Sequence, residues 1–343
     1  ISKIANEKYD KNDILQIASE LSNFSHFKSS NSNLKTIFEL AGKVFNKEIL
    51  QTLLQIKEHI SKIENKKIYN IFFVAWLSII EEVSNVKKEG NGIKYKNRKR
   101  TPNGYFTIEK EKWEASVFPK DKFQFVKTKL INKIKLISSD IKENYGSIDR
   151  KPQIFNNNCV NFNELFNDEI ELTFFSPPYC NSFDYFEIHK VELWLGEFVK
   201  NKEEFRLLKN SGFRSNTNAL NGKPINYTNQ HVEELINLFD TKRLWNKRIP
   251  NVVRGYFDDM HSLLKNLYNQ TIKSGYVGIV VGNSAYSGVI IPTDAIIADF
   301  AREIGFTVEN IFITRHLTTS SQQKVELSQL NNFLRESIII LKK

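Results

Sequence analysis

Four consecutive residues, Ser176, Pro177, Pro178 and Tyr179, have the types and the spacing that could orient a planar amino group. Two adjacent prolines fix φ and lack a backbone N–H, so this segment presents a rigid row of carbonyl acceptors. The Ser176 hydroxyl and the Pro177 carbonyl can accept hydrogen bonds from both hydrogens of an amine. The Tyr179 ring offers a face on which a flat ring can stack. The pattern therefore predicts a binding loop for a planar, aromatic amine.

Such acceptors would activate an amine that is otherwise a poor nucleophile. The exocyclic amine of cytosine or adenine has its lone pair delocalised into the ring, and acceptors for both hydrogens would pull the nitrogen toward tetrahedral geometry. In a duplex the base must first leave the stack. The protein would supply orientation and electrostatics, and a separate donor would supply the transferred group. No covalent enzyme intermediate is required, and we expect the adjacent Cys180 to be a buried, inert thiol.

Alternating strands and helices position this loop. Residues 171–175 form a predicted strand that runs directly into Ser176, and ligands of open α/β sheets bind beyond the carboxyl ends of strands. Further strands are predicted over residues 153–155, 276–281, 307–317 and 337–341, and helices over 185–199, 255–272 (with a glycine cap at 274–275) and 293–303. The fold class is therefore α/β, with helices on both faces of the sheet.

A different pattern occupies the first part of the chain. Apolar residues at three-four spacing predict one helix face from Ile68 to Val86 and another from Phe123 to Ile141. We therefore divide the chain into a mainly helical region, residues 1–148, and a catalytic α/β domain, residues 149–343. The polar stretch 201–250 interrupts the second domain and is a candidate target-recognition insert.

The strand followed by Ser176–Tyr179 resembles the catalytic motif of amino-group DNA methyltransferases, whose first position holds Asp, Asn or Ser. The similarity extends over most of the chain after about residue 150, through residues 185–196, 256–260, 275–284, 305–306 and 335–341. It implies a Rossmann-like methyltransferase sheet, S-adenosylmethionine as cofactor, double-stranded DNA as substrate and a role in restriction-modification. Ser176, Pro177, Pro178 and Tyr179 would then be catalytic, with Tyr179 stacking on the base. The Ser form favours cytosine N4 over adenine N6.

The cofactor site is incomplete in this sequence. The family binds S-adenosylmethionine through a turn resembling Phe-x-Gly-x-Gly after its first strand, and the nearest glycine pair, Gly282 and Gly288, follows a late strand. Residues 1–10 resemble the stretch that follows the family's second strand. We therefore expect an upstream segment or a companion subunit to carry the glycine-rich motif. The resemblance implies three cofactor contacts in this chain: Asn158, Ser176 and Pro177. At the position of Asn158 the family usually has Asp.

A net charge of +10 is consistent with a polyanionic partner. Residues 87–100 hold seven basic residues against one acidic residue and are predicted to form a surface loop. This loop either contacts DNA, through Arg98 and Arg100, or is merely solvated. A second basic cluster surrounds Trp245 and contributes Arg248 as a candidate substrate contact, with the same alternative.

Four further residues are candidates for the substrate side or are weighed against it. Asn283 either borders the substrate pocket or lies in a plain turn. Arg214, in the polar insert, is a candidate DNA contact. Asp258 and Asp259 are expected to be charges near a helix start, because adjacent helix positions point in different directions.

The composition argues against a disulfide-rich, a metal-binding or a membrane-spanning protein. Two cysteines and six scattered histidines give neither a disulfide framework nor a predicted metal site. No apolar run reaches the roughly 18–20 residues that cross a bilayer, so we expect a cytoplasmic protein. Two alternatives stay open. One is an RNA amino-methyltransferase, and the other is a non-catalytic DNA-recognition subunit of a split methyltransferase.

Overall fold

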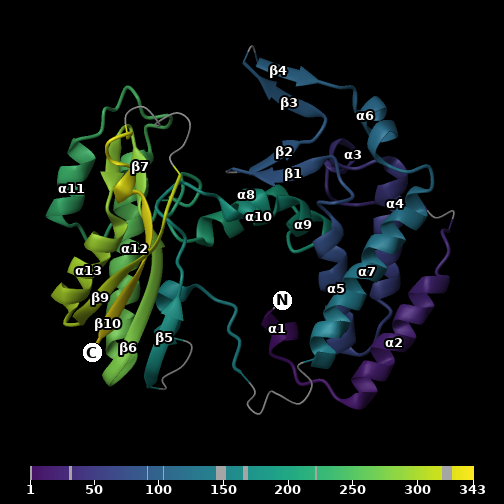
Figure 1. The fold of residues 1–343 in the computed structure, drawn as a ribbon, viewed down its shortest axis with the longest axis horizontal. Helices are drawn as coiled ribbons and strands as arrows, with labels where there is room; N and C mark the ends of the chain where they lie inside the picture. Colours follow the sequence, from purple (N-terminus) through teal and green to yellow (C-terminus); the bar gives the residue numbers. More distant parts are fainter. Residues whose placement is uncertain are drawn as a thin grey trace. The chain divides into compact units, whose positions relative to one another are not determined.

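The computed structural model describes residues 2–30, 33–90, 92–102, 104–143, 152–164, 169–220, 222–318 and 327–343. The chain forms two compact units (Figure 1). The first, the helical unit, comprises Ile1–Ile154 and Tyr185–Lys202, and the second, the sheet unit, comprises Phe155–Asp184 and Glu203–Lys343. Residues 185–202, which the sequence pattern places in the catalytic domain, thus group with the helical unit. Among the described residues, no helix combines the length and the apolar character needed to span a membrane.

The helical unit is built around two predicted apolar faces. Its helices are α1 (Ser2–Ala5), α2 (Lys11–His26), α3 (Ala41–Val44), α4 (Lys47–Ile60), α5 (Lys66–Ile79), α6 (Lys110–Val117), α7 (Lys122–Glu143), α8 (Tyr185–Ile188) and α9 (Lys190–Leu195). Helix α7 matches the expected range, whereas α5 ends at Ile79 and Val86 begins a strand. The single helix predicted over residues 185–199 is divided into α8 and α9.

The prediction of a surface loop over residues 87–100 is wrong. These residues form parts of two antiparallel hairpins, β1 (Val86–Glu89) with β2 (Gly92–Tyr95), and β3 (Arg98–Thr101) with β4 (Gly104–Thr107). Gly90 and Gly104 have φ of 62° and 121°, a conformation that glycine adopts without strain at tight turns. A hairpin pairs its own backbone groups, so a polar segment can be regular without burying an apolar core.

The sheet unit contains a four-stranded sheet in the order β5-β6-β10-β9. Its strands are β5 (Ile170–Phe175), β6 (Thr271–Gly282), β9 (Thr307–His316) and β10 (Arg335–Lys342). Strand β5 is parallel to β6, and β10 is antiparallel to both β6 and β9. The remaining elements are α10 (Lys202–Ser211), α11 (Gln230–Asn237), α12 (Ile249–Gln270), α13 (Thr293–Ile304), the hairpin β7 (Ser284–Tyr286) with β8 (Val289–Ile291), and the short 3-10 helices η1 (Cys159–Glu164) and η2 (Asn331–Phe333).

Two details of the predicted elements need correction. Residues 153–155 do not form a strand. Helix α12 ends at Gln270 and β6 begins at the next residue, so the predicted glycine cap at 274–275 is absent. Ser274 instead takes a left-handed φ of 67° inside β6. The mixed α/β class and helix α13, which ends before Gly305 at φ 121°, agree with the sequence prediction.

Helices cover one face of this sheet. Alternate residues of a strand point to opposite faces, and the inward set packs with α12 and α13 in one apolar core: Val277, Ile279, Val281, Ile339 and Leu341. On the other face, Leu172, Phe174 and Phe312 are 67%, 64% and 52% exposed. The expectation of helices on both faces is therefore not met by the described residues. The exposed face is apolar because its strands alternate apolar residues on both sides, as strands of a fully covered sheet do.

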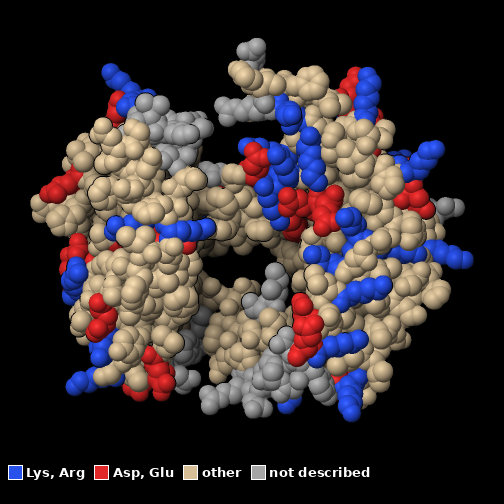
Figure 2. All heavy atoms as spheres, viewed as in Figure 1, with Lys and Arg blue, Asp and Glu red and all other residues tan. Residues whose placement is uncertain are grey.

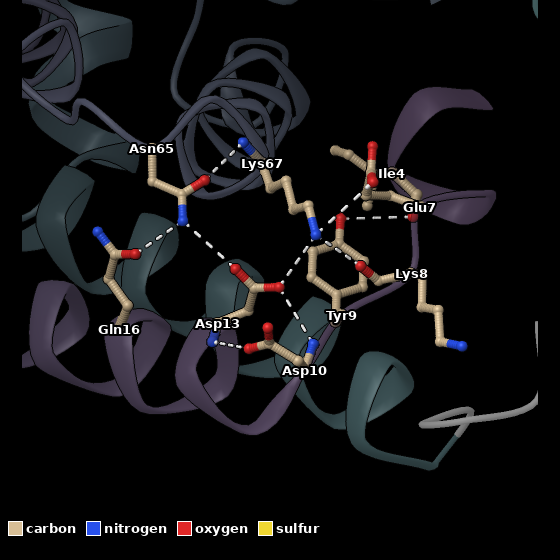
Figure 3. A network of polar contacts seen from close by, with 9 residues as sticks. All are labelled: Ile4, Glu7, Lys8, Tyr9, Asp10, Asp13, Gln16, Asn65 and Lys67. Carbon is tan, nitrogen blue, oxygen red and sulfur yellow. Dashed lines mark hydrogen bonds and ion pairs between the residues drawn. The ribbon is translucent and has the colours of Figure 1, made fainter. Parts of the chain in front are cut away.

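A polar network joins the starts of α2 and α5 in the helical unit (Figure 3). Asp10 and Asp13 cap α2 reciprocally, with Asp13 N donating to Asp10 Oδ1 at 2.8 Å. Asn65, which caps α5, donates to Asp13 Oδ1 at 3.3 Å, and Lys67 Nζ lies 3.2 Å from Asp13 Oδ2. Burial raises the pKa of Asp13, but hydrogen bonds from the Asp10 backbone, Lys67 and Asn65 outweigh it, so the pKa lies below its ordinary value.

We expect Asp13→Asn to lower the free energy of unfolding of the helical unit by about 1 kcal/mol at neutral pH. A carboxyl with a depressed folded-state pKa stabilises above its unfolded pKa of about 3.9, and this contribution is lost as the pH falls through the folded-state value. Denaturant unfolding at neutral and acid pH measures the difference, which should shrink below about pH 4. Glu64→Gln, at an exposed position, is the control. A difference that persists undiminished in acid contradicts the prediction.

Candidate active site

The motif loop leaves the carboxyl end of β5 and is held against β6. Ser176 is exposed, Pro177 is buried, and Tyr179 is half-buried. The Ser176 hydroxyl donates to the Val280 carbonyl of β6 at 3.1 Å. Because β5 and β6 are parallel, their carboxyl ends lie at the same edge of the sheet. The loop therefore stands at the edge where the sequence pattern placed it.

Tyr179 is fixed at both ends. Its ring lies against Gly282, where an added Cβ would meet ring carbons at 2.7 Å, so only glycine fits that position without displacing the ring. Its hydroxyl donates to Glu336 Oε2 at 2.7 Å. Burial and then the Glu336 carboxylate raise the pKa of Tyr179 to about 12, so the phenol is neutral at physiological pH.

Glu336 is itself held by a bidentate ion pair. Arg315 Nε and Nη2 lie 3.0 and 2.8 Å from the two carboxylate oxygens of Glu336. This pair, followed by the hydrogen bond from Tyr179, lowers the pKa of Glu336. Neither Glu336 nor Arg315 is predicted from the sequence to have a role at the site, because both lie far from Tyr179 in the chain. The antiparallel register Glu336↔Arg315 of β10 and β9 brings them together, and no local sequence signal reveals that register.

The hairpin β7–β8 supports the other end of the loop. The Cys180 carbonyl accepts hydrogen bonds from Ser284 Oγ at 2.5 Å and from Tyr286 Oη at 3.0 Å. Ser182 takes a left-handed φ of 61°, and its backbone N–H donates to the Ser215 carbonyl at 3.0 Å. The Cys180 side chain is fully buried, and burial raises the pKa of its thiol, as expected for an inert cysteine.

Asn283 was a candidate substrate contact, but its side chain is bonded within the protein. Its side chain is buried, and its Oδ1 accepts the Asp294 backbone N–H at the start of α13, at 3.1 Å. Its Nδ2 donates to the Phe333 carbonyl at 3.0 Å. Both ends of the amide are therefore used to join β6, α13 and η2. Asn283 sits in a turn that fixes the edge of the sheet.

The other predicted contacts are dispersed. Asn158 accepts the Val160 N–H at 3.0 Å and opens η1, which α12 holds through Asn266 Nδ2 and the Val160 carbonyl at 2.6 Å. Arg248 is exposed just before α12. Arg254, a nearby basic residue in α12, is paired within the protein, because its Nη2 lies 2.6 Å from Glu233 Oε2.

Arg98 and Arg100 belong to β3, in the helical unit, and thus to a different unit from the motif loop. Arg98 is exposed. The backbone of Arg100 pairs with Tyr105 in the hairpin, and its side chain lies outside the described residues.

Arg214 is buried, which corrects its assignment as a DNA contact. Its Nη2 lies 2.6 Å from Asp258 Oδ2 and 2.7 Å from Asp259 Oδ1, and the backbone N–H donates to Asp259 as well. Asp258 also accepts the backbone N–H of Tyr227 at 2.9 Å. An added Cβ at Gly255 would lie 2.9 Å from the Arg214 side chain, so glycine leaves room for it. The two aspartates anchor the polar insert on α12.

Known proteins similar to this chain are methyltransferases. It is 27% identical over 303 residues to the type II methyltransferase M.BsoBI of Geobacillus stearothermophilus, covering 78% of this chain and 58% of the relative. It is 27% identical over 274 residues to the type II methyltransferase M.AvaI of Nostoc sp., covering 73% of this chain and 54% of the relative.

The chain thus spans rather more than half the length of these curated relatives. No protein-family model matches it, and no solved structure matches it. The two relatives confirm the resemblance to methyltransferases that the motif predicted.

Proposed function

We propose that the sheet unit holds the target base of a site-specific DNA methyltransferase that acts in restriction-modification in the cytoplasm. The proposed reaction transfers a methyl group from S-adenosylmethionine to an exocyclic amine, with cytosine N4 favoured over adenine N6. The observation that carries this proposal is the Ser176–Tyr179 loop at the carboxyl end of β5, with Tyr179 clamped by Glu336. The similarity to two type II methyltransferases supports the class.

The hydrogen bond of Ser176 determines how the loop would act on the amine. Because its hydroxyl hydrogen is donated to Val280, the lone pairs of Oγ, which lies beside the Tyr179 hydroxyl, would be the part that meets a substrate. They would accept one amine hydrogen, and the Pro177 carbonyl would accept the other. The nitrogen lone pair would then point out of the ring plane, and S-adenosylmethionine would supply the electrophilic methyl group. Removing rotational freedom in this way accounts for much of the rate enhancement expected of such sites.

Tyr179 would hold the base in that orientation. A ring fixed by Gly282 on one side and by Glu336 at its hydroxyl loses little conformational entropy when a base stacks on its free face. Glu336 and Arg315 are positioning residues in this scheme, because they act on the substrate only through Tyr179.

The cofactor site requires a second part. Asn158, Ser176 and Pro177 are the proposed cofactor contacts in this chain, and the sequence has no glycine-rich turn to complete them. Strand β5 is the outer strand of the sheet, and Leu172 and Phe174 expose an apolar face beside it. An outer strand and an uncovered apolar face favour further pairing and packing. We propose that an upstream segment or companion subunit with the glycine-rich motif completes the sheet there.

Transfer of tritium from labelled S-adenosylmethionine to unmethylated DNA, followed by separation of the nucleosides, tests the proposal. The assay uses the chain together with its gene neighbours. Label in 4-methylcytosine or 6-methyladenine supports it and names the base. In a parallel assay that offers RNA, label in RNA alone would favour an RNA amino-methyltransferase. DNA binding without transfer, in the presence of every neighbouring gene product, would favour the non-catalytic recognition subunit, which the absent glycine turn makes the second candidate.

Glu336→Gln tests the clamp on Tyr179 directly. Replacing the carboxylate by an amide removes a negative charge that disfavours the phenolate, so we expect the pKa of Tyr179 to fall from about 12. Tyrosinate absorbance, read as the difference between each protein and its Tyr179→Phe counterpart, isolates this one phenol. An unchanged pKa would show that Glu336 does not act on Tyr179 in solution.

A further inference from the structure

The hairpin β3–β4 places basic residues directly across from exposed aromatic rings. Its register pairs Lys99 with Phe106 and Arg100 with Tyr105. Tyr105 and Phe106 are 72% and 60% exposed, and every described residue of β4 is exposed. Large aromatic side chains on both faces of one ribbon are not explained by packing within the chain. They indicate a surface that is built for a partner.

The neighbouring hairpin β1–β2 is also basic, but its lysines form ion pairs within the protein. Lys94 Nζ lies 2.6 Å from Glu89 Oε1, and Lys87 pairs with the same carboxylate. Lys88 Nζ lies 2.5 Å from Glu192 Oε1. Within the part of the chain that the structure describes, the side chains of Arg98 and Lys99 have no such partner. Figure 2 shows blue and red side chains next to one another in the region of β1–β2.

The base of β3–β4 is fixed although its faces are open. Asn97 N donates to Oδ1 of the buried Asn85 at 3.1 Å, and Asn85 Nδ2 donates to Asn97 Oδ1, also at 3.1 Å. Asn97 Nδ2 also donates to the Ile108 carbonyl at 2.8 Å, and Asn85 N donates to the Val44 carbonyl at 2.7 Å. An isolated two-stranded hairpin is marginally stable, so these bonds are what hold the ribbon out from the core.

We propose that hairpin β3–β4 is a DNA-contacting ribbon that lies along a groove of the duplex outside the target base. Arg98 and Lys99 would meet phosphates, and Tyr105 and Phe106 would pack on sugars and base edges. A two-stranded ribbon fits the major groove, and uncompensated cations favour a polyanion over an apolar protein partner. This inference rests on the proposed function, because it takes the DNA of that reaction as its ligand.

Binding of the chain to a fluorescein-labelled duplex, measured by anisotropy over a range of salt concentrations, tests the ribbon. Arg98→Ala/Lys99→Ala should weaken binding about tenfold or more and reduce the salt slope by about 1–2, the value for one or two lost phosphate contacts. Lys87→Ala/Lys94→Ala removes the same net charge from the paired hairpin and should change affinity less than about twofold. Tyr105→Ala/Phe106→Ala should weaken binding with little change in the salt slope.

The outcomes separate this inference from the proposed function. If the wild-type chain binds the duplex and all three double variants bind equally well, the ribbon is not a DNA contact, and the proposed function stands. If the Arg98/Lys99 and Lys87/Lys94 pairs lose equal affinity, general charge replaces the ribbon as the explanation. If the variants lose affinity only for single strands, the assignment to duplex is overturned. If the wild-type chain does not bind duplex DNA even with its gene neighbours present, the ribbon is overturned, and the methyl-transfer assay decides the proposed function separately.

Discussion

Ser176→Ala is expected to slow methyl transfer by about 10²–10³-fold while leaving DNA affinity nearly unchanged. The substitution removes one of two preorganised hydrogen-bond partners of the amine, and the loss of one such group typically has this magnitude. The remaining Pro177 carbonyl accepts only one amine hydrogen, so the nitrogen keeps more of its delocalised, unreactive geometry. Single-turnover rates with labelled cofactor, measured on the complete enzyme beside duplex affinity, give the two quantities separately.

Two controls make the Ser176 result interpretable. Ser138→Ala removes a hydroxyl that likewise donates to a main-chain carbonyl, that of Ile134 at 2.8 Å, but in the helical unit, and it should leave the rate unchanged. Tyr179→Ala should abolish transfer, because the base loses its stacking surface. Full activity of Ser176→Ala would remove the loop from the mechanism. If Ser176→Ala and Tyr179→Ala both still protect cellular DNA from the cognate restriction enzyme, the non-catalytic recognition subunit would be favoured.

Arg214→Ala is expected to lower the free energy of unfolding of the sheet unit by about 3–5 kcal/mol. The arginine is buried between Asp258 and Asp259, and its removal leaves two carboxylates in the interior without their cation. It also frees the polar insert from α12 next to Ser215, whose carbonyl holds the motif loop at Ser182. Denaturant unfolding followed by circular dichroism measures the stability change.

Arg254→Ala provides the matched comparison. This arginine lies in α12, the helix that Arg214 contacts, and makes a bidentate pair with Glu233, but the pair is partly exposed, so its loss should cost about 1 kcal/mol or less. Equal losses for Arg214→Ala and Arg254→Ala would show that burial does not give the Arg214 cluster its importance.

Local patterns in the sequence determined the motif loop and much of the sheet unit. Strands β5, β6, β9 and β10, helix α13 and the buried Cys180 follow from short-range alternation, proline rigidity and helix start and stop signals, which neighbouring residues carry. Local patterns failed where one composition is compatible with two structures. Residues 87–100, a basic and glycine-containing stretch, were predicted to be a loop but form parts of two hairpins, because cross-strand pairing needs no apolar core.

Only the tertiary structure decided which polar residues meet. Tyr179 reaches Glu336 because β10 pairs with β6, and Arg214 reaches two aspartates because the insert folds back on α12. From the sequence, Asn283 was either a pocket residue or part of a plain turn, and Arg214 was a candidate DNA contact, because their residue types suit both a ligand and an internal carboxylate or backbone group. Their burial and partners depend on residues tens of positions away. The type and spacing of residues fixed the chemistry available to this chain, and long-range strand register and helix packing selected which groups are free to perform it.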